Sequence, residues 1–383
     1  MSVLVKDLHT VNLPTGTLHL EVEQGPSIDS LCAFAARSNP KRGFLIVSKV
    51  LGRHIPSRPR QMRETMNSLA AGLPEDMPGP IVFLGMAETA TALGQGVFAA
   101  YRELYPHLEA VYLQTSRQRD ARACVLTNFE EGHSHATTHL VQASDVHIEA
   151  LVRSGRSLVI IDDECSTGGT FKSAATGMKA LMPHLQTIHT CCITDWSGGE
   201  YLAEMPVQSH RHAVLKGSMR WQAGEAQAQS KLASSSNTPG VAPLQGMRSR
   251  IGITAPEAAK RRGVQPNSGE RILVLGDGEH SYEALLVAEE IEAKGGIAAV
   301  QCITRSPALL GNAMQSVSRF SDAYGSGAPC YLYNIMGHQP DRIVIVTEMP
   351  AGQGREATQA LHELSYNKPV EVVVCSYHEG EKA

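Results

Sequence analysis

The stretch from Leu158 to Phe171 constrains the fold of this 383-residue chain more than any other. It begins with four consecutive apolar residues, a pattern that indicates a strand buried on both faces inside a parallel sheet. Asp162 and Asp163 follow, then a turn of small residues, and then a stretch from Lys172 that is typical of a helix. The segment therefore predicts a strand–turn–helix unit of an α/β fold, with two carboxylates at the carboxyl end of the strand.

The turn at residues 166–170 carries groups suited to a phosphate. Small hydroxyls and glycines at the start of a helix let backbone N–H groups close around a phosphate, helped by the positive end of the helix. Carboxylates beside such a turn are poor phosphate ligands, but they accept hydrogen bonds well from a pair of ribose hydroxyls. This one unit therefore fits a ribose that bears a 5'-phosphate.

The same segment resembles the phosphoribosyl-pyrophosphate (PRPP) signature of type I phosphoribosyltransferases: an apolar strand, two acids, two variable residues, then hydroxyl-Thr-Gly-Gly-Thr. The resemblance implies that Asp162 and Asp163 bind the ribose and Mg²⁺, and that the turn binds the 5'-phosphate. Glu164 departs from the pattern, in which an apolar residue is common, and it either touches the acceptor base or faces water. The residues implied to bind PRPP are Asp162, Asp163, Glu164, Cys165, Ser166, Thr167, Gly168, Gly169 and Thr170.

A second strand–loop–helix spans residues 80–97, with an apolar strand that ends at Gly85 and a helix from about Thr89. In the resembled family the corresponding loop holds the pyrophosphate through its backbone. The resemblance implies this role for Met86, Ala87, Glu88 and Thr89, of which Glu88 is an unusual member because it is acidic. The same turn also occurs in many doubly wound folds.

After a third strand at residues 110–116 the chain becomes polar and irregular as far as residue 139. A long stretch of this kind is either disordered or a functional lid. In the family a mobile loop here closes over PRPP and brings basic residues to the leaving pyrophosphate. The resemblance makes Arg117, Arg119, His133 and His135 the candidate catalytic residues, since negative charge grows on pyrophosphate in the transition state.

Three further segments surround this core. Residues 1–40 form a hood in our interpretation, with a strand from Gly16 and a short helix over Ile28 to Arg37. Cations cluster after the strand that follows the hood, where they suit an anionic ligand or form a solvated basic loop: Lys49, Arg53, Arg58 and Arg60. Trp196 follows a strand at residues 187–195, and it either stacks on an acceptor base or packs at a domain edge.

The chain divides into a first domain at residues 1–221, a linker at 222–254 and a second, smaller α/β domain at 255–383. The linker is rich in Ala, Gln, Ser, Pro and Gly. In the second domain, short apolar strands alternate with helices at residues 281–294 and 354–364, which predicts a second, mainly parallel sheet.

The tetrapeptide Thr304-Arg305-Ser306-Pro307 in the second domain extends the resemblance. With the upstream signature it is similar to two-domain proteins in which an orotate-phosphoribosyltransferase-like domain precedes a domain named TRSP, associated with bacterial tellurite-resistance and stress gene clusters. The loops at residues 276–281 and 304–307 both follow strands, where such sheets bind ligands. They predict a second ligand site, or else serve as turns and caps, and the candidates are Asp277, Glu279, His280 and Arg305.

Composition excludes other classes of protein. With 34 basic and 38 acidic residues, the net charge of −4 gives no electrostatic case for binding nucleic acid or an anionic membrane. No apolar run approaches the roughly 20 residues that span a bilayer. The start is not that of a signal peptide, and eight scattered cysteines suit buried thiols, so we expect a cytoplasmic protein.

The sequence therefore favours an enzyme that transfers 5-phosphoribosyl from PRPP to a nitrogenous base, orotate-like or a related heterocycle, and releases pyrophosphate. Its product would serve a nucleotide-like biosynthetic or stress pathway. The rival from another class is a regulatory protein that binds PRPP or a nucleotide without chemistry, which the unusual Glu88 and Glu164 would suit. The sequence does not fix the oligomeric state, although the resemblance suggests a homodimer because enzymes of this type often pair.

Overall fold

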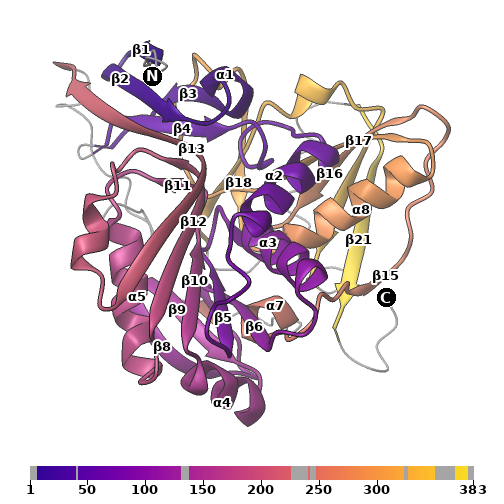
Figure 1. Cartoon of the computed structure of the whole chain (residues 1–383). Coiled ribbons are helices and arrows are strands. Elements are labelled where there is room, and N and C mark those ends of the chain that lie inside the picture. Colours follow the sequence, from indigo (N-terminus) through magenta and orange to yellow (C-terminus); the bar gives the residue numbers. More distant parts are fainter. Residues whose placement is uncertain are drawn as a thin grey trace.

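The computed structural model describes residues 7–39, 42–130, 138–225, 240–241, 247–322, 327–349 and 367–377. Two sheets organise these residues, one of eight strands in the first domain and one of five in the second (Figure 1). The expected order of a larger parallel-sheet domain followed by a smaller α/β domain is therefore observed.

The first sheet is parallel in its centre and antiparallel at one side. Its order is β1-β2-β13-β12-β10-β5-β6, with β11 paired to β12. All pairs from β13 to β6 are parallel, whereas β2 joins β13 and β1 joins β2 in antiparallel fashion. The strands are β1 (Asp7–Leu13), β2 (Gly16–Gln24), β5 (Ile81–Gly85), β6 (Ala110–Gln114), β10 (Ser157–Ile161), β11 (Glu164–Cys165), β12 (Thr187–Asp195) and β13 (Gln208–Ala223).

Helices cover both faces of this sheet. In Figure 1, α2 and α3 lie on one face and α5 on the other. Residues of β5 and β10 are buried on both faces, which explains why their sequences are continuously apolar rather than alternating. The helices are α1 (Ile28–Leu31), α2 (Pro59–Ala71), α3 (Thr91–Leu104), α4 (Val146–Ser154), α5 (Gly169–Leu181), η1 (Glu200–Glu204) and α7 (Arg248–Ile251).

Two sequence predictions in the first domain are corrected. The helix expected over Ile28 to Arg37 is only one turn, α1, because Cys32–Ala36 forms strand β3, whose backbone pairs with β4 (Phe44–Ser48). The stretch expected to be irregular contains an antiparallel hairpin, β8 (Cys124–Glu130) with β9 (Thr138–Ala143), and β8 packs on α5. The short strand β7 (Gln118–Arg119) pairs with β14 (Gly240–Val241).

The second sheet has the order β15-β21-β20-β16-β17 and is parallel except at β15, as predicted. The helix expected over residues 354–364 lies outside the described residues. The elements are β15 (Lys260–Arg261), β16 (Arg271–Gly276), α8 (Tyr282–Ala293), β17 (Ile297–Cys302), η2 (Ile335–His338), β20 (Arg342–Thr347) and β21 (Val370–Ser376), with a separate hairpin of β18 (Val317–Ser321) and β19 (Pro329–Tyr333).

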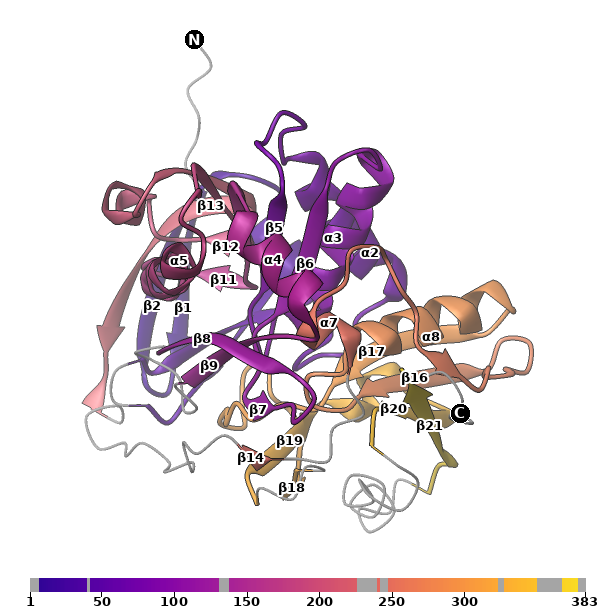
Figure 2. The ribbon, with the colours of Figure 1, turned by 90° about the horizontal axis from the view of Figure 1, so that it is seen from below.

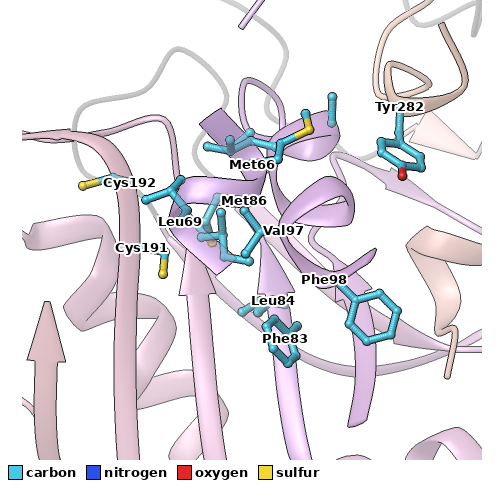
Figure 3. Close-up of a cluster of buried hydrophobic side chains, with 14 of the residues drawn as sticks. Met66, Leu69, Phe83, Leu84, Met86, Val97, Phe98, Cys191, Cys192 and Tyr282 are labelled. Carbon is cyan, nitrogen blue, oxygen red and sulfur yellow. The ribbon is translucent and has the colours of Figure 1, made fainter. Parts of the chain in front are cut away.

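The two domains share one continuous apolar core. Helix α8 packs on α2 and α3 of the first domain and on β16 and β17 of its own sheet, so the helices lie between the two sheets (Figures 1 and 2). Figure 3 shows part of this core, in which Met66 of α2 and Phe98 of α3 belong to the same cluster as Tyr282 of α8. The linker residue Ile253 also exchanges backbone hydrogen bonds with Tyr112 of β6. No helix in the described part of the chain is both long and apolar enough to cross a membrane.

Candidate active site

The carboxyl ends of β5 and β10 lie side by side, because Gly85 is the register partner of Ile161. The Met86 N–H donates to the Ile161 carbonyl at 2.9 Å, which fixes the loop after β5 beside the loop after β10. A cavity opens at this edge, and both loops line it. The two segments that the sequence singled out are thus brought together. Met86 itself is the exception, since its side chain is buried in the core (Figure 3) and does not line the cavity.

The turn at residues 166–170 requires glycine at one position. Gly168 has a φ of +78°, and a Cβ placed there would lie 2.1 Å from the ring of Tyr201. At Gly169 a Cβ would meet only the Thr167 hydroxyl, at 3.7 Å. Helix α5 begins at Gly169, so the N–H groups of its first turn have no acceptor within the helix. These donors and the positive helix end face a cavity that all five turn residues line, an arrangement that suits a phosphate.

Asp162 and Asp163 are half-buried and line the same cavity. Burial, together with the neighbouring negative charge of Glu164, raises the pKa of Asp163. Hydroxyl donors or a cation placed beside these two carboxyl groups would stabilise their ionised form. The arrangement therefore suits a polyhydroxylated ligand or a metal ion that arrives with it.

Glu164 lines the cavity and is paired within the protein, so of the two roles left open by the sequence it does not simply face water. Its carboxylate accepts two hydrogen bonds from Arg42 Nη2, at 2.7 and 2.9 Å. The Arg42 guanidinium lies 4.6 Å from the centroid of the Phe44 ring. Glu164 therefore ties the β3–β4 hairpin to the turn, and Arg42 is a site residue for which the sequence held no motif.

Glu88, the acid in the loop after β5, faces two arginines from different parts of the chain. Its Oε1 lies 3.7 Å from Arg53 Nη1 and its Oε2 lies 3.9 Å from Arg305 Nε. Of the four cations expected near an anionic ligand, only Arg53 lines the cavity. Arg58 and Arg60 are exposed, and Lys49 Nζ donates to the Asp29 carbonyl at 2.6 Å.

The candidate catalytic residues are separated by the structure. Arg117 lines the cavity and donates to the carbonyls of Thr138, at 3.0 Å, and Ala87, at 3.5 Å. Arg119 is exposed on β7 and does not line the cavity, and His133 and His135 lie outside the described residues. A residue that the sequence analysis missed is His139: it is buried, stacks on Phe129 and lines the cavity.

Comparison with known families places both halves of the chain. A phosphoribosyl transferase family matches residues 31–218, and the TRSP domain, described as C-terminal to that phosphoribosyl transferase domain, matches residues 245–364. The chain therefore joins a phosphoribosyl transferase domain to a TRSP domain. No curated protein matches the chain.

Solved structures of phosphoribosyltransferases are similar to about half of the chain. Adenine phosphoribosyltransferase from Rhodothermus marinus is 16% identical, with 49% of this chain and 96% of that chain covered and a TM-score of 0.34. The enzyme from Giardia lamblia, complexed with 9-deazaadenine, is also 16% identical, with 49% and 94% covered and a TM-score of 0.34. The enzyme from Trypanosoma brucei is 12% identical, with 50% and 82% covered and a TM-score of 0.33.

The four second-site candidates of the TRSP domain are not equivalent. Glu279 accepts hydrogen bonds from Ser116 Oγ and the Arg117 N–H, both at 2.7 Å. Asp277 accepts one from Thr347 Oγ1 at 2.9 Å, and His280 Nε2 lies 2.5 Å from the Tyr377 hydroxyl. All three are buried and do not line the cavity, whereas Arg305 does. Of the two roles left open by the sequence, three candidates thus make structural contacts at or near the domain interface, and the fourth, Arg305, lines the same cavity as Asp162 and Asp163.

Trp196 is buried and does not line the cavity. Gly217 of β13 packs closely on it, because a Cβ on that glycine would lie 2.9 Å from the indole ring. Of the two roles considered for Trp196, packing is the one that this position supports.

Proposed function

We propose that this phosphoribosyltransferase transfers the 5-phosphoribosyl group from PRPP to a nitrogenous base, orotate-like or a related heterocycle, and releases pyrophosphate. The observation that carries the proposal is the meeting of three features at one cavity: the half-buried pair Asp162 and Asp163, the glycine turn at 166–170, and the loop after β5. Each suits a different part of PRPP. A nucleotide-like product and a cytoplasmic location complete the proposal.

In this proposal the 5'-phosphate binds the N–H groups of the turn, and the ribose hydroxyls donate to Asp162 and Asp163. The pyrophosphate lies against Ala87, Glu88 and Thr89, which line the cavity after β5. A nitrogen lone pair of the base attacks C1, the C1–O bond to pyrophosphate breaks, and its electron pair leaves on pyrophosphate. Arg117 stands where it can stabilise that growing negative charge.

The acceptor would lie under the β3–β4 hairpin, where Leu45, Ile46 and His54 line the same cavity. Burial, together with the positive charges of Arg53 and Arg37, lowers the pKa of His54 to about 3, so its imidazole is neutral. Its Nε2 is buried and has no hydrogen-bond partner among the described residues. The neutral His54 ring beside Leu45 and Ile46 leaves this wall of the cavity uncharged, which suits the ring of a heterocycle.

The residues present fit a magnesium ion that arrives with PRPP. Asp162 and Asp163 would hold it, and Mg²⁺ takes one or two protein carboxylates together with phosphate oxygens and water. The described residues contain no cluster of three or more His, Cys, Asp or Glu side chains that could hold a metal by themselves. When bound, the ion would neutralise charge on the pyrophosphate.

The test is to incubate the full chain with PRPP, Mg²⁺ and a panel of pyrimidines, purines and related heterocycles, and to follow pyrophosphate release. We expect release that depends on one class of base. The variant Asp162→Asn with Asp163→Asn should lose at least about a hundredfold in rate while it keeps its melting temperature. A matched control, Glu75→Gln with Asp76→Asn, alters an exposed adjacent acid pair and should retain full activity.

Full activity in the Asp162, Asp163 double variant would contradict the proposal. Binding of PRPP without release for any base would instead favour a sensor that keeps the PRPP site. The assay therefore separates the two functions that the sequence left open.

A further inference from the structure

Arg305 belongs to the TRSP domain but lies in the cavity of the phosphoribosyltransferase domain. It follows β17 in the tetrapeptide at residues 304–307, and Thr304, Arg305 and Ser306 all line the cavity. The Thr304 N–H and carbonyl exchange backbone hydrogen bonds with Tyr331 of β19, at 3.1 and 2.7 Å. The position of Arg305 is therefore set by strands of the second domain.

Two arginines approach the loop after β5, and both make hydrogen bonds to groups other than the Glu88 carboxylate. Arg53, whose side chain is 2% exposed, donates to the Ile303 carbonyl at 2.7 Å and to the Glu88 carbonyl. Arg305 donates through Nη2 to Asp322 Oδ2 at 2.8 Å. These contacts would keep both guanidinium groups near the loop if the Glu88 side chain moved away.

The Glu88 carboxylate is held loosely by comparison. It lies 3.7 and 3.9 Å from the two guanidinium groups, whereas the Arg42–Glu164 pair in the same cavity has a distance of 2.7 Å. Its side chain is 16% exposed. Displacing this carboxylate therefore costs less than breaking a close, bidentate ion pair.

The negative charge of Glu88 in the loop after β5 would oppose the binding of pyrophosphate. A carboxylate in contact with pyrophosphate repels it, so binding requires nearby cations that outweigh the acid. Arg53 and Arg305 supply two positive charges against one, and the planar guanidinium suits phosphate oxygens. The carboxylate also offers the arginines a counter-ion when no substrate is bound.

We propose that Arg53 and Arg305 together form the pyrophosphate site, and that Glu88 occupies these two arginines until the pyrophosphate group of PRPP displaces it. The inference rests on the proposed function, because it assigns one part of the same PRPP site. It gives the TRSP domain a defined role: this domain completes the active site of the domain before it and needs no separate chemistry of its own.

The test is calorimetric titration of the full chain with two fragments of PRPP, namely pyrophosphate with Mg²⁺ and ribose 5-phosphate. Arg305→Gln removes the charge but can still donate to Asp322, and we expect it to weaken pyrophosphate binding by about tenfold or more. Ribose 5-phosphate binding should stay within about twofold, because the turn at 166–170 is untouched. Arg319→Gln is the matched control, since Arg319 is exposed in the same domain, and it should change neither affinity.

Glu88→Gln provides an independent test on a partly exposed residue, and should tighten pyrophosphate binding because the competing charge is gone. Pyrophosphate affinity equal to wild type in Arg305→Gln, with ribose 5-phosphate still bound, would overturn the inference but leave the proposed function intact. If Arg305→Gln loses both ligands through misfolding, Glu88→Gln decides: unchanged or weaker pyrophosphate binding overturns the inference. A wild-type protein that binds neither fragment would contradict the proposed function itself.

Discussion

The carboxyl ends of the strands are used differently in the two domains. In the phosphoribosyltransferase domain, Asp162 and Asp163 after β10 remain half-buried beside an open cavity. In the TRSP domain, Asp277 and Glu279 after β16 are buried and accept hydrogen bonds from Thr347 and Ser116. Similar loops at equivalent edges thus line an open cavity in one domain and make buried contacts between segments in the other.

The difference follows from docking. The TRSP domain places the end of β16 against the first domain, so that Glu279 contacts the segment at residues 116–117 and Arg250 of the linker helix α7. Arg305 follows β17, the strand next to β16 in the sheet, and its position there lies beside the cavity rather than in the contact between the domains. A strand-end acid is therefore a ligand candidate only where no second domain covers it.

Substituting Arg250 should have the largest effect on stability among the variants that test whether the buried acids of the second domain serve the domain contact. Its fully buried guanidinium donates to Glu279 at 3.1 Å and to both oxygens of Glu348, at 3.1 and 2.6 Å. Arg250→Met leaves two buried carboxylates without this cation, and we expect a loss of roughly 3–5 kcal/mol in the free energy of unfolding in urea. Arg60→Met, at the exposed pair with Glu64, should leave the free energy of unfolding nearly unchanged. Equal losses in the two variants would mean that the interface network does not stabilise the docked domains.

A smaller effect on stability is expected from substituting the glycines of the turn at residues 166–170. Gly168→Ala should lower stability by roughly 1–3 kcal/mol, because φ is positive and the new Cβ meets Tyr201. Gly169→Ala should leave the melting temperature nearly unchanged, since its Cβ meets only the Thr167 hydroxyl. Thermal melts of both variants without ligand check the pair. A larger loss at Gly169 would contradict the described turn.

The smallest effect concerns pH and three buried histidines. Burial lowers the pKa of His54 to about 3, and those of His189 and His280 to about 4. Unfolded histidines take up protons near pH 6.5, so below that pH the unfolded state binds more protons than the folded state. Stability should therefore fall as the pH drops from about 6.5 to about 4, and should not depend on these groups above 6.5.

Melting temperatures across this range test the prediction, with His189→Gln as the variant that should show a shallower fall. His184→Gln is the control, since His184 is exposed on the surface after α5. A flat profile from pH 7 to pH 4 would show that the three imidazoles are not held neutral in the folded state.

The sequence predicted what depends on short segments. The strand at residues 158–161, its two acids and the glycine turn lie within one unit, so their pattern predicted their local structure. Strand β3 was mistaken for a helix because its alanines suit a helix, whereas pairing with β4 decides its conformation. The hairpin β8–β9 was missed because its first strand is largely exposed, without a buried face to give a clear alternation of apolar and polar residues.

Contacts between distant segments could not be predicted. Arg42, His54 and His139 belong to no recognisable sequence motif. The first sheet and the β3–β4 hairpin bring them to the cavity. Arg305 was recognised from its tetrapeptide and expected in a separate second site, but it lines the cavity of the first domain, because its place depends on how the two domains dock. For these residues, only the fold shows that their side chains line the same cavity.

The most direct test of the account is calorimetric titration of PRPP with Mg²⁺ into two variants. One variant changes an acid at the carboxyl end of β10 in the first sheet, and the other changes an acid at the carboxyl end of β16 in the second sheet. Burial raises the pKa of Asp277 to about 7, so Asp277→Asn resembles a form of this residue that already exists near neutral pH. We expect Asp277→Asn to bind PRPP as wild type does, and Asp163→Asn to bind it at least about tenfold more weakly. Loss of binding in Asp277→Asn with full binding in Asp163→Asn would place the PRPP site on the other sheet and contradict the account.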